Sequence, residues 1–303
     1  MSFYVVGIGE VLWDLLPDGP QLGGAPANFA YHAQALGANA AVITRVGNDA
    51  RGQEVRQRFQ EMGLALAEVQ VDEKAPTGTV SVSLASGGIP AYVIHENVAW
   101  DYIVATREAL QWVRAAQVVC FGSLAQRHAV SRQAIQRLLS SAAASAWKIF
   151  DVNLRQDFFD RETIEHSLRL ANVLKLNEHE LPVIARMFEI NGDPREQIRE
   201  VATRFGLQVV ALTRGAAGSL LYRDGQWAQA VAAAAKAKDT VGAGDAFTAV
   251  LSVGLMRDLE LDEINRAANR IAAHVCSSPG ATPPVPDELR RLLDSGSALP
   301  TRG

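Results

Sequence analysis

The segment Phe3-Tyr4-Val5-Val6-Gly7-Ile8 is a short apolar run that ends beside a glycine, and it predicts a buried strand. After an irregular connection, residues 26–36 carry apolar side chains at helical spacing, and a glycine follows directly. A second strand is predicted over residues 41–46, and a second amphipathic helix covers residues 55–62. The chain therefore begins with the order β-α-β-α.

The same alternation continues beyond the first hundred residues. Strands are predicted at 118–121, 149–152, 173–176 and 209–212, and helical patterns at 134–139 and 164–170. Strands that alternate with helices indicate a mostly parallel sheet flanked by helices on both faces, which is an α/β fold. A chain of 303 residues suits one large domain or two, and no interdomain linker is recognisable. We therefore expect a single domain over residues 1–303.

One segment departs from this alternation. Residues 77–95 alternate apolar and hydroxyl side chains with a period of two, and Ser86-Gly87-Gly88 supplies a turn. This pattern predicts a β-hairpin with one packed face and one wet face. We expect a small β lid over a site, inserted at about residues 11–22 and 77–101.

Composition and charge exclude several classes of partner. The chain is 48% hydrophobic, and 33 acidic against 29 basic residues give a net charge of −4 without a basic run. Nucleic acid and anionic lipid are therefore not expected as partners. The uncharged stretch 19–44 holds too many Gly, Pro, Asn and His residues for a membrane helix. The first basic residue is Arg45, and Cys120 and Cys276 lie far apart, so we expect a cytoplasmic protein.

The segment Asp239-Thr240-Val241-Gly242-Ala243-Gly244-Asp245-Ala246-Phe247 carries the clearest chemistry. Its glycines permit a sharp turn, and apolar residues at helical spacing follow, so the glycines open a helix. A helix start offers free N–H groups and a positive dipole end to a phosphoryl oxygen. Asp245, in the first turn, is placed as the base of a kinase, and the dipole is expected to favour its charged form.

This segment resembles the C-terminal signature of the ribokinase-like carbohydrate kinases, the phosphofructokinase B family. Four more segments match that family in the same order along the chain: Gly23-Gly24-Ala25-Pro26-Ala27-Asn28, Phe150-Asp151-Val152-Asn153-Leu154-Arg155, Asn177-Glu178-His179-Glu180 and Thr213-Arg214-Gly215-Ala216-Ala217-Gly218. The resemblance covers nearly the whole chain. It implies a parallel sheet flanked by helices with a small β lid.

The resemblance also implies roles for individual residues. Asp245 corresponds to the catalytic base, and Gly242, Ala243 and Gly244 correspond to the backbone anion hole. Asn177 and Glu180 correspond to the family's element near Mg²⁺ and the phosphates of ATP. The residues alone favour a different interpretation, in which Asn177 is an N-cap and acidic residues occupy the first turn of a helix.

Two further groups of positions follow from the resemblance. The nucleotide side corresponds to Thr213, Gly215 and Gly218. The sugar side corresponds to Asp14, Gly24, Asn28 and Arg155. A monovalent cation is compatible with Gly280-Ala281, but carbonyl ligands leave no side-chain pattern, so the sequence does not assign that site.

We therefore expect ATP-dependent phosphorylation of a sugar's primary hydroxyl, with fructose converted to fructose 6-phosphate as first choice. Another ribokinase-like sugar kinase, such as a 2-keto-3-deoxygluconate kinase, is the alternative, since Arg155 can face a carboxylate. A sugar-sensing protein without catalysis is a third hypothesis. A dinucleotide enzyme is disfavoured, because Leu12 replaces the last glycine of G-x-G-x-x-G. The lid strands also permit a homodimer.

Overall fold

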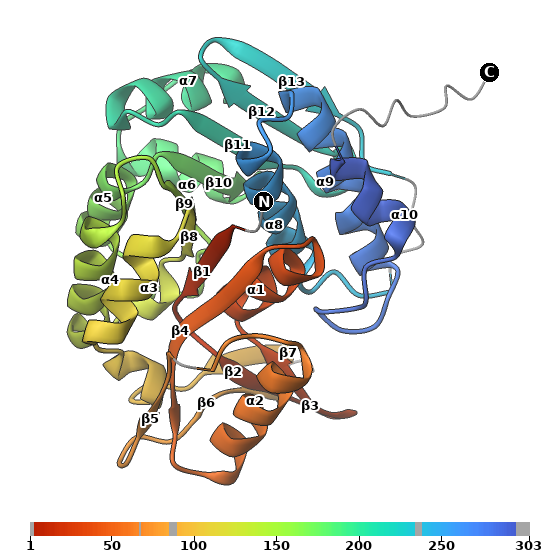
Figure 1. The fold of residues 1–303 in the computed structure, drawn as a ribbon. Helices are drawn as coiled ribbons and strands as arrows, with labels where there is room; N and C mark the ends of the chain where they lie inside the picture. Colours follow the sequence, from red (N-terminus) through yellow and green to blue (C-terminus); the bar gives the residue numbers. More distant parts are fainter. Residues whose placement is uncertain (1–2, 67, 85–89, 234–237, 295–303) are drawn as a thin grey trace.

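The computed structural model describes residues 3–66, 68–84, 90–233 and 238–294. Within these ranges nine strands form one large sheet in the order β13-β12-β11-β10-β9-β8-β1-β4-β5 (Figure 1). Their bounds are β1 Tyr4–Ile8, β4 Asn39–Gly47, β5 Val69–Asp72, β8 Val118–Phe121, β9 Trp147–Asp151, β10 Val173–Asn177, β11 Val209–Thr213, β12 Ser219–Arg223 and β13 Gln226–Ala230. All neighbours from β5 to β11 pair in parallel, and β12 and β13 are antiparallel. The predicted, mostly parallel sheet is confirmed.

Helices cover both faces of this sheet (Figure 1). One hydrophobic core joins the sheet to α1 Ala25–Ala35, α2 Ala50–Glu61, α8 Ala243–Met256, α9 Leu261–Cys276 and α10 Asp287–Arg290. The other joins it to α3 Arg107–Ala115, α4 Ala129–Ser141, α5 Arg161–Leu170, α6 Glu180–Met187 and α7 Pro194–Phe205. Successive strand residues alternate between the cores: Val5 packs in the first and Val6 in the second. This explains why the central strands are continuous apolar runs.

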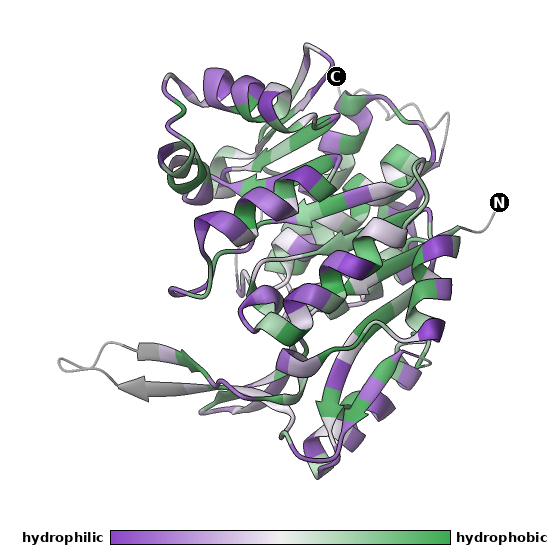
Figure 2. Cartoon of the chain, turned by 90° about the vertical axis from the view of Figure 1, so that its left-hand side faces the viewer, coloured by the Kyte–Doolittle hydropathy of each residue, from purple (hydrophilic) through white to green (hydrophobic). Residues whose placement is uncertain are grey.

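A second, smaller sheet projects from the large one (Figure 2). Its order is β3-β2-β6-β7, with β3 Gly19–Gly23, β2 Leu12–Leu16, β6 Gly78–Leu84 and β7 Pro90–Ile94. β6 and β7 pair antiparallel, as the alternation predicted. The tip at Gly87–Gly88 lies outside the described residues.

The residue pattern predicted an irregular connection after β1, and that prediction is wrong, because the lid segment expected at about residues 11–22 contains β2 and most of β3. β2 pairs antiparallel with β3, which follows it directly. It also pairs in parallel with β6, which lies more than sixty residues further along the chain. Local propensity missed β3 because Gly19, Pro20 and Gly23 are poor strand formers. An edge strand tolerates a proline, since one side needs no ladder hydrogen bonds.

The parallel strands bring polar residues to one edge of the large sheet. Asp151, Asn177 and Thr213 are the last residues of β9, β10 and β11. In the ladder Lys175 lies opposite Asp151, and Asn177 lies opposite Thr213. Open α/β sheets bind their ligands beyond the carboxyl ends of the strands, so the fold places the candidate site here.

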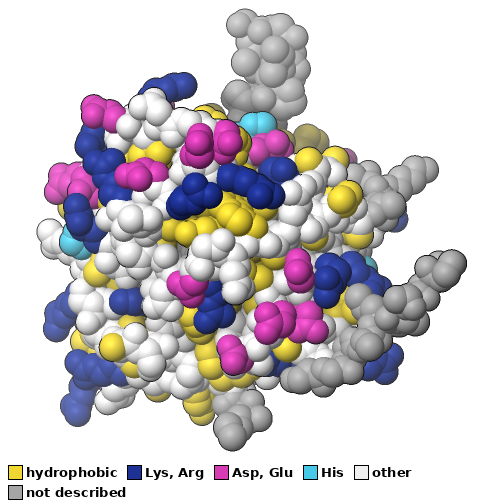
Figure 3. Space-filling view, turned by 90° about the horizontal axis from the view of Figure 1, so that it is seen from above, with side chains coloured by type: hydrophobic (Ala, Val, Ile, Leu, Met, Phe, Trp, Pro, Cys, Tyr) yellow, Lys and Arg dark blue, Asp and Glu magenta, His cyan; other side chains and the backbone are white. Residues whose placement is uncertain are grey.

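No helix within the described parts of the chain is long and apolar enough to cross a membrane. The face shown in Figure 3 carries basic and acidic side chains close to one another, around apolar patches.

Candidate active site

The glycine turn forms the start of α8. Gly242 is the N-cap residue, with a left-handed φ of 80°. A Cβ there would also lie 2.7 Å from Cα of Ala281, so the position excludes any larger residue on two grounds. Residues 246–255 of α8 are buried, which anchors the helix that carries the turn. The predicted helix start is confirmed.

Asp245 lies in the first turn of α8 and meets a residue from the other end of the chain. The side-chain amide Nδ2 of Asn28 donates a hydrogen bond of 2.8 Å to Oδ2 of Asp245. Asn28 is buried on α1, whose N-cap residue is Gly24. A Cβ on Gly24 would lie 2.9 Å from Cα of Val11, so only glycine fits against that backbone. The structure thus joins the predicted base to the predicted sugar-side motif.

The charge state of Asp245 differs from the sequence expectation. Its pKa is raised to about 6, mainly by burial and to a smaller extent by the nearby carboxylate of Asp151. The hydrogen bond from Asn28 and the charges of Lys175 and Arg155 lower the pKa without offsetting burial. The prediction that the helix dipole favours the charged form is therefore wrong in its net direction. A carboxyl group with a pKa near 6 is a better proton acceptor than an ordinary aspartate.

A buried ion pair lies beside the turn, and the sequence analysis missed it. Nζ of Lys175 lies 2.9 Å from Oδ1 of Asp151, and both side chains are almost fully buried. Oγ1 of Thr248, one turn after Asp245, donates 2.9 Å to Oδ2 of Asp151. A Cβ on Gly244 would lie 3.0 Å from Nζ of Lys175, so the ammonium group touches the turn.

Opposing effects act on this lysine. Burial lowers the pKa of Lys175, but the carboxylates of Asp151 and Glu180 raise it, and the net shift is upward. Lys175 therefore stays charged at neutral pH. A signal for it exists in the sequence: it is the one charged residue within the predicted strand 173–176. Buried charges are paired as a rule, so a partner such as Asp151 was to be expected.

Asn177 and Glu180 bind one another at the start of α6. Oδ1 of Asn177 accepts the backbone N–H of Glu180 at 3.0 Å, and Oε2 of Glu180 accepts that of Asn177 at 2.8 Å. The N-cap residue of α6 is His179, so Asn177 is not the N-cap that the residues alone suggested, although the two reciprocal hydrogen bonds resemble those of a capping box. Oε1 of Glu180 also accepts the N–H of Leu154 at 3.0 Å. Glu180 thus ties the segment after β9 to the end of β10.

The other predicted nucleotide-side residues lie one strand further along. Thr213 ends β11, and Gly215 begins a short 3-10 turn with a φ of 51°. A Cβ on Gly218 would lie 2.7 Å from the backbone nitrogen of Ala232. Gly215 thus allows a left-handed turn close to Glu178, and Gly218 lies directly against the backbone of residues 230–232.

On the sugar side, the charges of Asp14 and Arg155 attract one another. Asp14 is half-buried in β2, not on an irregular segment as predicted. Burial raises its pKa, and Arg155 lowers it. Arg155 is exposed, in a segment where Asn153 and Gln156 hold left-handed φ angles of 44° and 48°. Such strained residues gather at functional sites.

Two further residues, Gln156 and Glu10, belong to the sugar side. Nε2 of Gln156 donates 2.6 Å to the carbonyl oxygen of Tyr92 on β7, which links the Arg155 segment to the small sheet. Glu10, shortly after β1, is almost fully buried and was also missed. Burial raises its pKa to about 7, Arg155 lowers it and Asp245 raises it. Glu10 therefore contributes only part of a negative charge at neutral pH.

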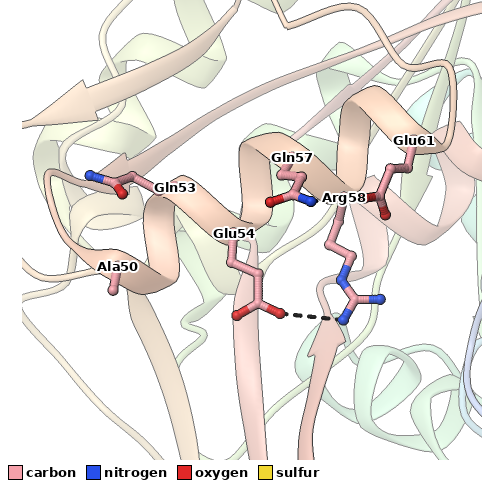
Figure 4. A pocket seen from close by; sticks show the side chains of 6 residues that line it. All are labelled: Ala50, Gln53, Glu54, Gln57, Arg58 and Glu61. Atoms are coloured by element: carbon pink, nitrogen blue, oxygen red, sulfur yellow. Dashed lines mark hydrogen bonds and ion pairs between the residues drawn. The ribbon is translucent and has the colours of Figure 1, made fainter.

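A separate hollow lies along the outer side of α2 (Figure 4). It is lined by exposed side chains of this one helix, among them the ion pair Arg58–Glu54 at 3.3 Å. None of the predicted site residues lines it. Pockets for small ligands are concave and enclosed by several elements, so this hollow is not the candidate site.

A glycine turn at a helix start, a carboxyl group in its first turn and polar strand ends beside it have the form of a phosphoryl-transfer site. The model of the pfkB family of carbohydrate kinases matches residues 20–288. The chain belongs to this family and is a carbohydrate kinase with a ribokinase-like fold. The resemblance and the fold class predicted from the sequence are confirmed.

Individual relatives agree with this assignment. The uncharacterized sugar kinase PH1459 of Pyrococcus horikoshii is 29% identical, over 97% of both chains. Its crystal structure aligns with a TM-score of 0.81 at 28% identity, covering 96% of this chain and 99% of that one. A fructokinase of Klebsiella pneumoniae is 29% identical, over 94% of this chain and 98% of its own.

A third relative has been solved with bound molecules. The fructokinase of Vibrio cholerae O395, in a form with fructose, ADP and calcium ion bound, aligns with a TM-score of 0.78 at 25% identity. The alignment covers 97% of this chain and 99% of that one.

Proposed function

We propose that this carbohydrate kinase transfers the γ-phosphoryl group of ATP to a primary hydroxyl of a sugar, with fructose giving fructose 6-phosphate. The observation that most supports this proposal is the hydrogen bond between Asn28 and Asp245. It brings an amide from the sugar-side motif within 2.8 Å of the proposed base, so one hydroxyl can contact both. Relatives named fructokinase support the choice of sugar.

In the proposed reaction Asp245 accepts the proton as the sugar oxygen attacks the γ-phosphorus. The bond from the γ-phosphorus to the bridging oxygen breaks, and ADP leaves. The N–H groups of Gly242, Ala243 and Gly244 would stabilise the developing charge on the phosphoryl oxygens, for which Ala243 exchanges its 3.4 Å contact with the carbonyl oxygen of Thr240. Lys175 adds a fixed positive charge next to Gly244.

Mg²⁺ is the metal expected with ATP, and the residues fit an ion held mainly by phosphates and water. The described residues include no group of three His, Cys, Asp or Glu side chains at metal-ligand distance. Each Glu180 oxygen accepts one backbone N–H and keeps a lone pair for a metal-bound water. Glu180, next to Asn177, would hold the ion, which neutralises phosphate charge. Thr213, Gly215 and Gly218 would lie along the nucleotide.

The charges around the sugar pocket favour a neutral acceptor. Arg155 lowers the pKa of Asp14, of Asp245 and of the partly ionised Glu10, whereas the nearby Lys175 is already paired with Asp151. A sugar acid such as 2-keto-3-deoxygluconate would add a negative charge to a pocket that already carries an excess. A polyol avoids this repulsion and offers hydroxyl donors to Asp14 and Asp245.

An ADP-release screen tests the proposal. The panel is fructose, ribose, 2-keto-3-deoxygluconate, adenosine and fructose phosphates, each with Mg²⁺ and ATP in sodium or potassium buffer. We expect the highest kcat/KM with fructose, and ³¹P NMR should identify fructose 6-phosphate. Preference for the sugar acid would support the alternative kinase. Sugar binding without ADP release would support a sugar-sensing protein, and a difference between the buffers would support a monovalent cation site.

We also propose that two copies pair through the small sheet. Tyr92 and Val93 on the edge strand β7 are 57% and 42% exposed, and an exposed edge can accept another strand. Light scattering after size exclusion should give the mass of a dimer, which Val93→Lys should shift toward the monomer.

Both cysteines are free, which supports the expected cytoplasmic location.

A further inference from the structure

A buried histidine that takes no part in the proposed reaction lies behind the glycine turn. His32 is on α1, four residues after Asn28, and is completely buried. Its Nε2 lies 2.9 Å from the carbonyl oxygen of Ala281. A carbonyl oxygen only accepts hydrogen bonds, so Nε2 must carry the proton. Burial lowers the pKa of His32 to about 4, which is consistent with a neutral ring.

Ala281 in turn forms a wall of the glycine turn. Gly242 packs directly on Ala281, whose carbonyl oxygen and Cα are the nearest atoms to a Cβ placed on the glycine. A shift of this wall would change the space in which the left-handed Gly242 is held. The hydrogen bond from His32 holds the same carbonyl group.

The helix α1 therefore holds both ends of the anion-binding turn. Asn28 binds Asp245 inside the first turn of α8, and His32 binds the wall against its N-cap residue. Residues i and i+4 lie on one face of a helix, so a single rigid element makes both contacts.

We propose that His32 is a positioning residue for phosphoryl transfer, which sets the backbone of the Gly242 turn through its hydrogen bond to Ala281. The inference rests on the proposed function. His32 touches neither substrate. It acts on the geometry of the N–H groups that stabilise the transferring group, so its loss should affect turnover more than sugar binding.

A matched control exists in the loop between α9 and α10, which contains Ala281. His274 of α9 places its Nε2 2.9 Å from the carbonyl oxygen of Pro284, three residues after Ala281. Both histidines thus hold this loop to a helix. Pro284 is not among the atoms nearest to Gly242, so loss of the His274 contact removes a loop anchor without touching the wall.

The experiment compares His32→Leu, His32→Gln, His32→Asn and His274→Leu with the wild type. His32→Leu should lower kcat by about 10- to 100-fold, with the fructose KM within about twofold, because misplacement by about 1 Å can cost 10² in rate. His32→Gln keeps a donor that reaches Ala281 and should recover most of the rate. His32→Asn is too short and should not. His274→Leu should stay within about twofold of the wild-type kcat.

Melting curves fix an assay temperature at which every variant is folded. If His32→Leu does not fold, the Gln and Asn variants give the same comparison. Equal kcat for these two, an equal loss in His274→Leu, or a parallel rise in the sugar KM would overturn the proposal. The ¹⁵N shifts of the wild-type ring should report the neutral Nε2–H tautomer, and the other tautomer would also overturn it. A wild-type protein inactive on all sugars would instead count against the proposed function.

Discussion

Asn28 and Asp245 lie 217 residues apart in the sequence and share a hydrogen bond of 2.8 Å. One belongs to the helix that follows the first strands of the chain, and the other opens a helix near its end. The bond forms because α1 and α8 pack side by side on the same face of the sheet. The proposed base is therefore oriented by the sugar-side motif.

The first prediction concerns Asp245→Asn. Loss of the proton acceptor should lower kcat by about 10²–10⁴, because general-base catalysis typically contributes that factor. The folded pKa of about 6 exceeds the ordinary 3.8, so the wild type loses stability as pH rises through that interval. The variant avoids a cost of at most about 3 kcal/mol and should melt no lower than the wild type at pH 8. Steady-state kinetics and melting curves at pH 8 test both; near wild-type turnover would contradict the role.

The sequence predicted the large sheet well, because its strands are apolar on both faces and alternate with helices. Short motifs also singled out Asp245, Asn28 and the glycine turn as candidates, and the structure brings Asn28 and Asp245 together. The sequence did not predict β5, β12 or β13. The residue pattern alone also gave the segment of β2 and β3 as irregular, because β2 is completed by its long-range pairing with β6. The direction of the pKa shift of Asp245 failed for the same reason. Burial and the carboxylate of Asp151 come from distant segments and exceed the local helix dipole.

The second prediction uses the ion pair between Lys175 and Asp151. Asp245 must be ionised to act as a base, so kcat/KM for the sugar should rise with pH through about 6. Lys175 lowers the pKa of Asp245 and Asp151 raises it. Lys175→Met should therefore move this acidic limb to higher pH, and Asp151→Asn should move it to lower pH.

Both variants leave a buried group unpaired and should lower stability by several kcal/mol. If the ion pair were purely structural, both variants would lose activity, but the acidic limbs of their pH profiles would not move in opposite directions. Shifts of the same sign in the two pH profiles would contradict the electrostatic role.

The third prediction concerns Glu180→Gln. The amide keeps only one of the two oxygens that accept the N–H groups of Leu154 and Asn177. We expect a lower melting temperature, a higher Mg²⁺ concentration at half-maximal rate and a lower kcat. Glu178→Gln removes an exposed carboxylate in the same segment and is the matched control. An unchanged Mg²⁺ titration in Glu180→Gln would leave this residue with only its structural role.

The last prediction concerns the link between the small sheet and the sugar side. Nε2 of Gln156 donates to the carbonyl oxygen of Tyr92, next to Arg155. Gln156→Asn keeps a residue type that tolerates the left-handed φ of 48° but is too short to reach β7. If the small sheet closes over the acceptor, the fructose KM should rise by about 3- to 10-fold, as expected for one lost hydrogen bond. The ATP KM should stay unchanged. Without its link the lid also admits water more easily, so ATP hydrolysis in the absence of sugar should increase. Gln53→Asn, on the exposed side of α2, is the control for a shortened amide elsewhere. An equal rise in both KM values would show that Gln156 supports the fold as a whole and not closure over the sugar.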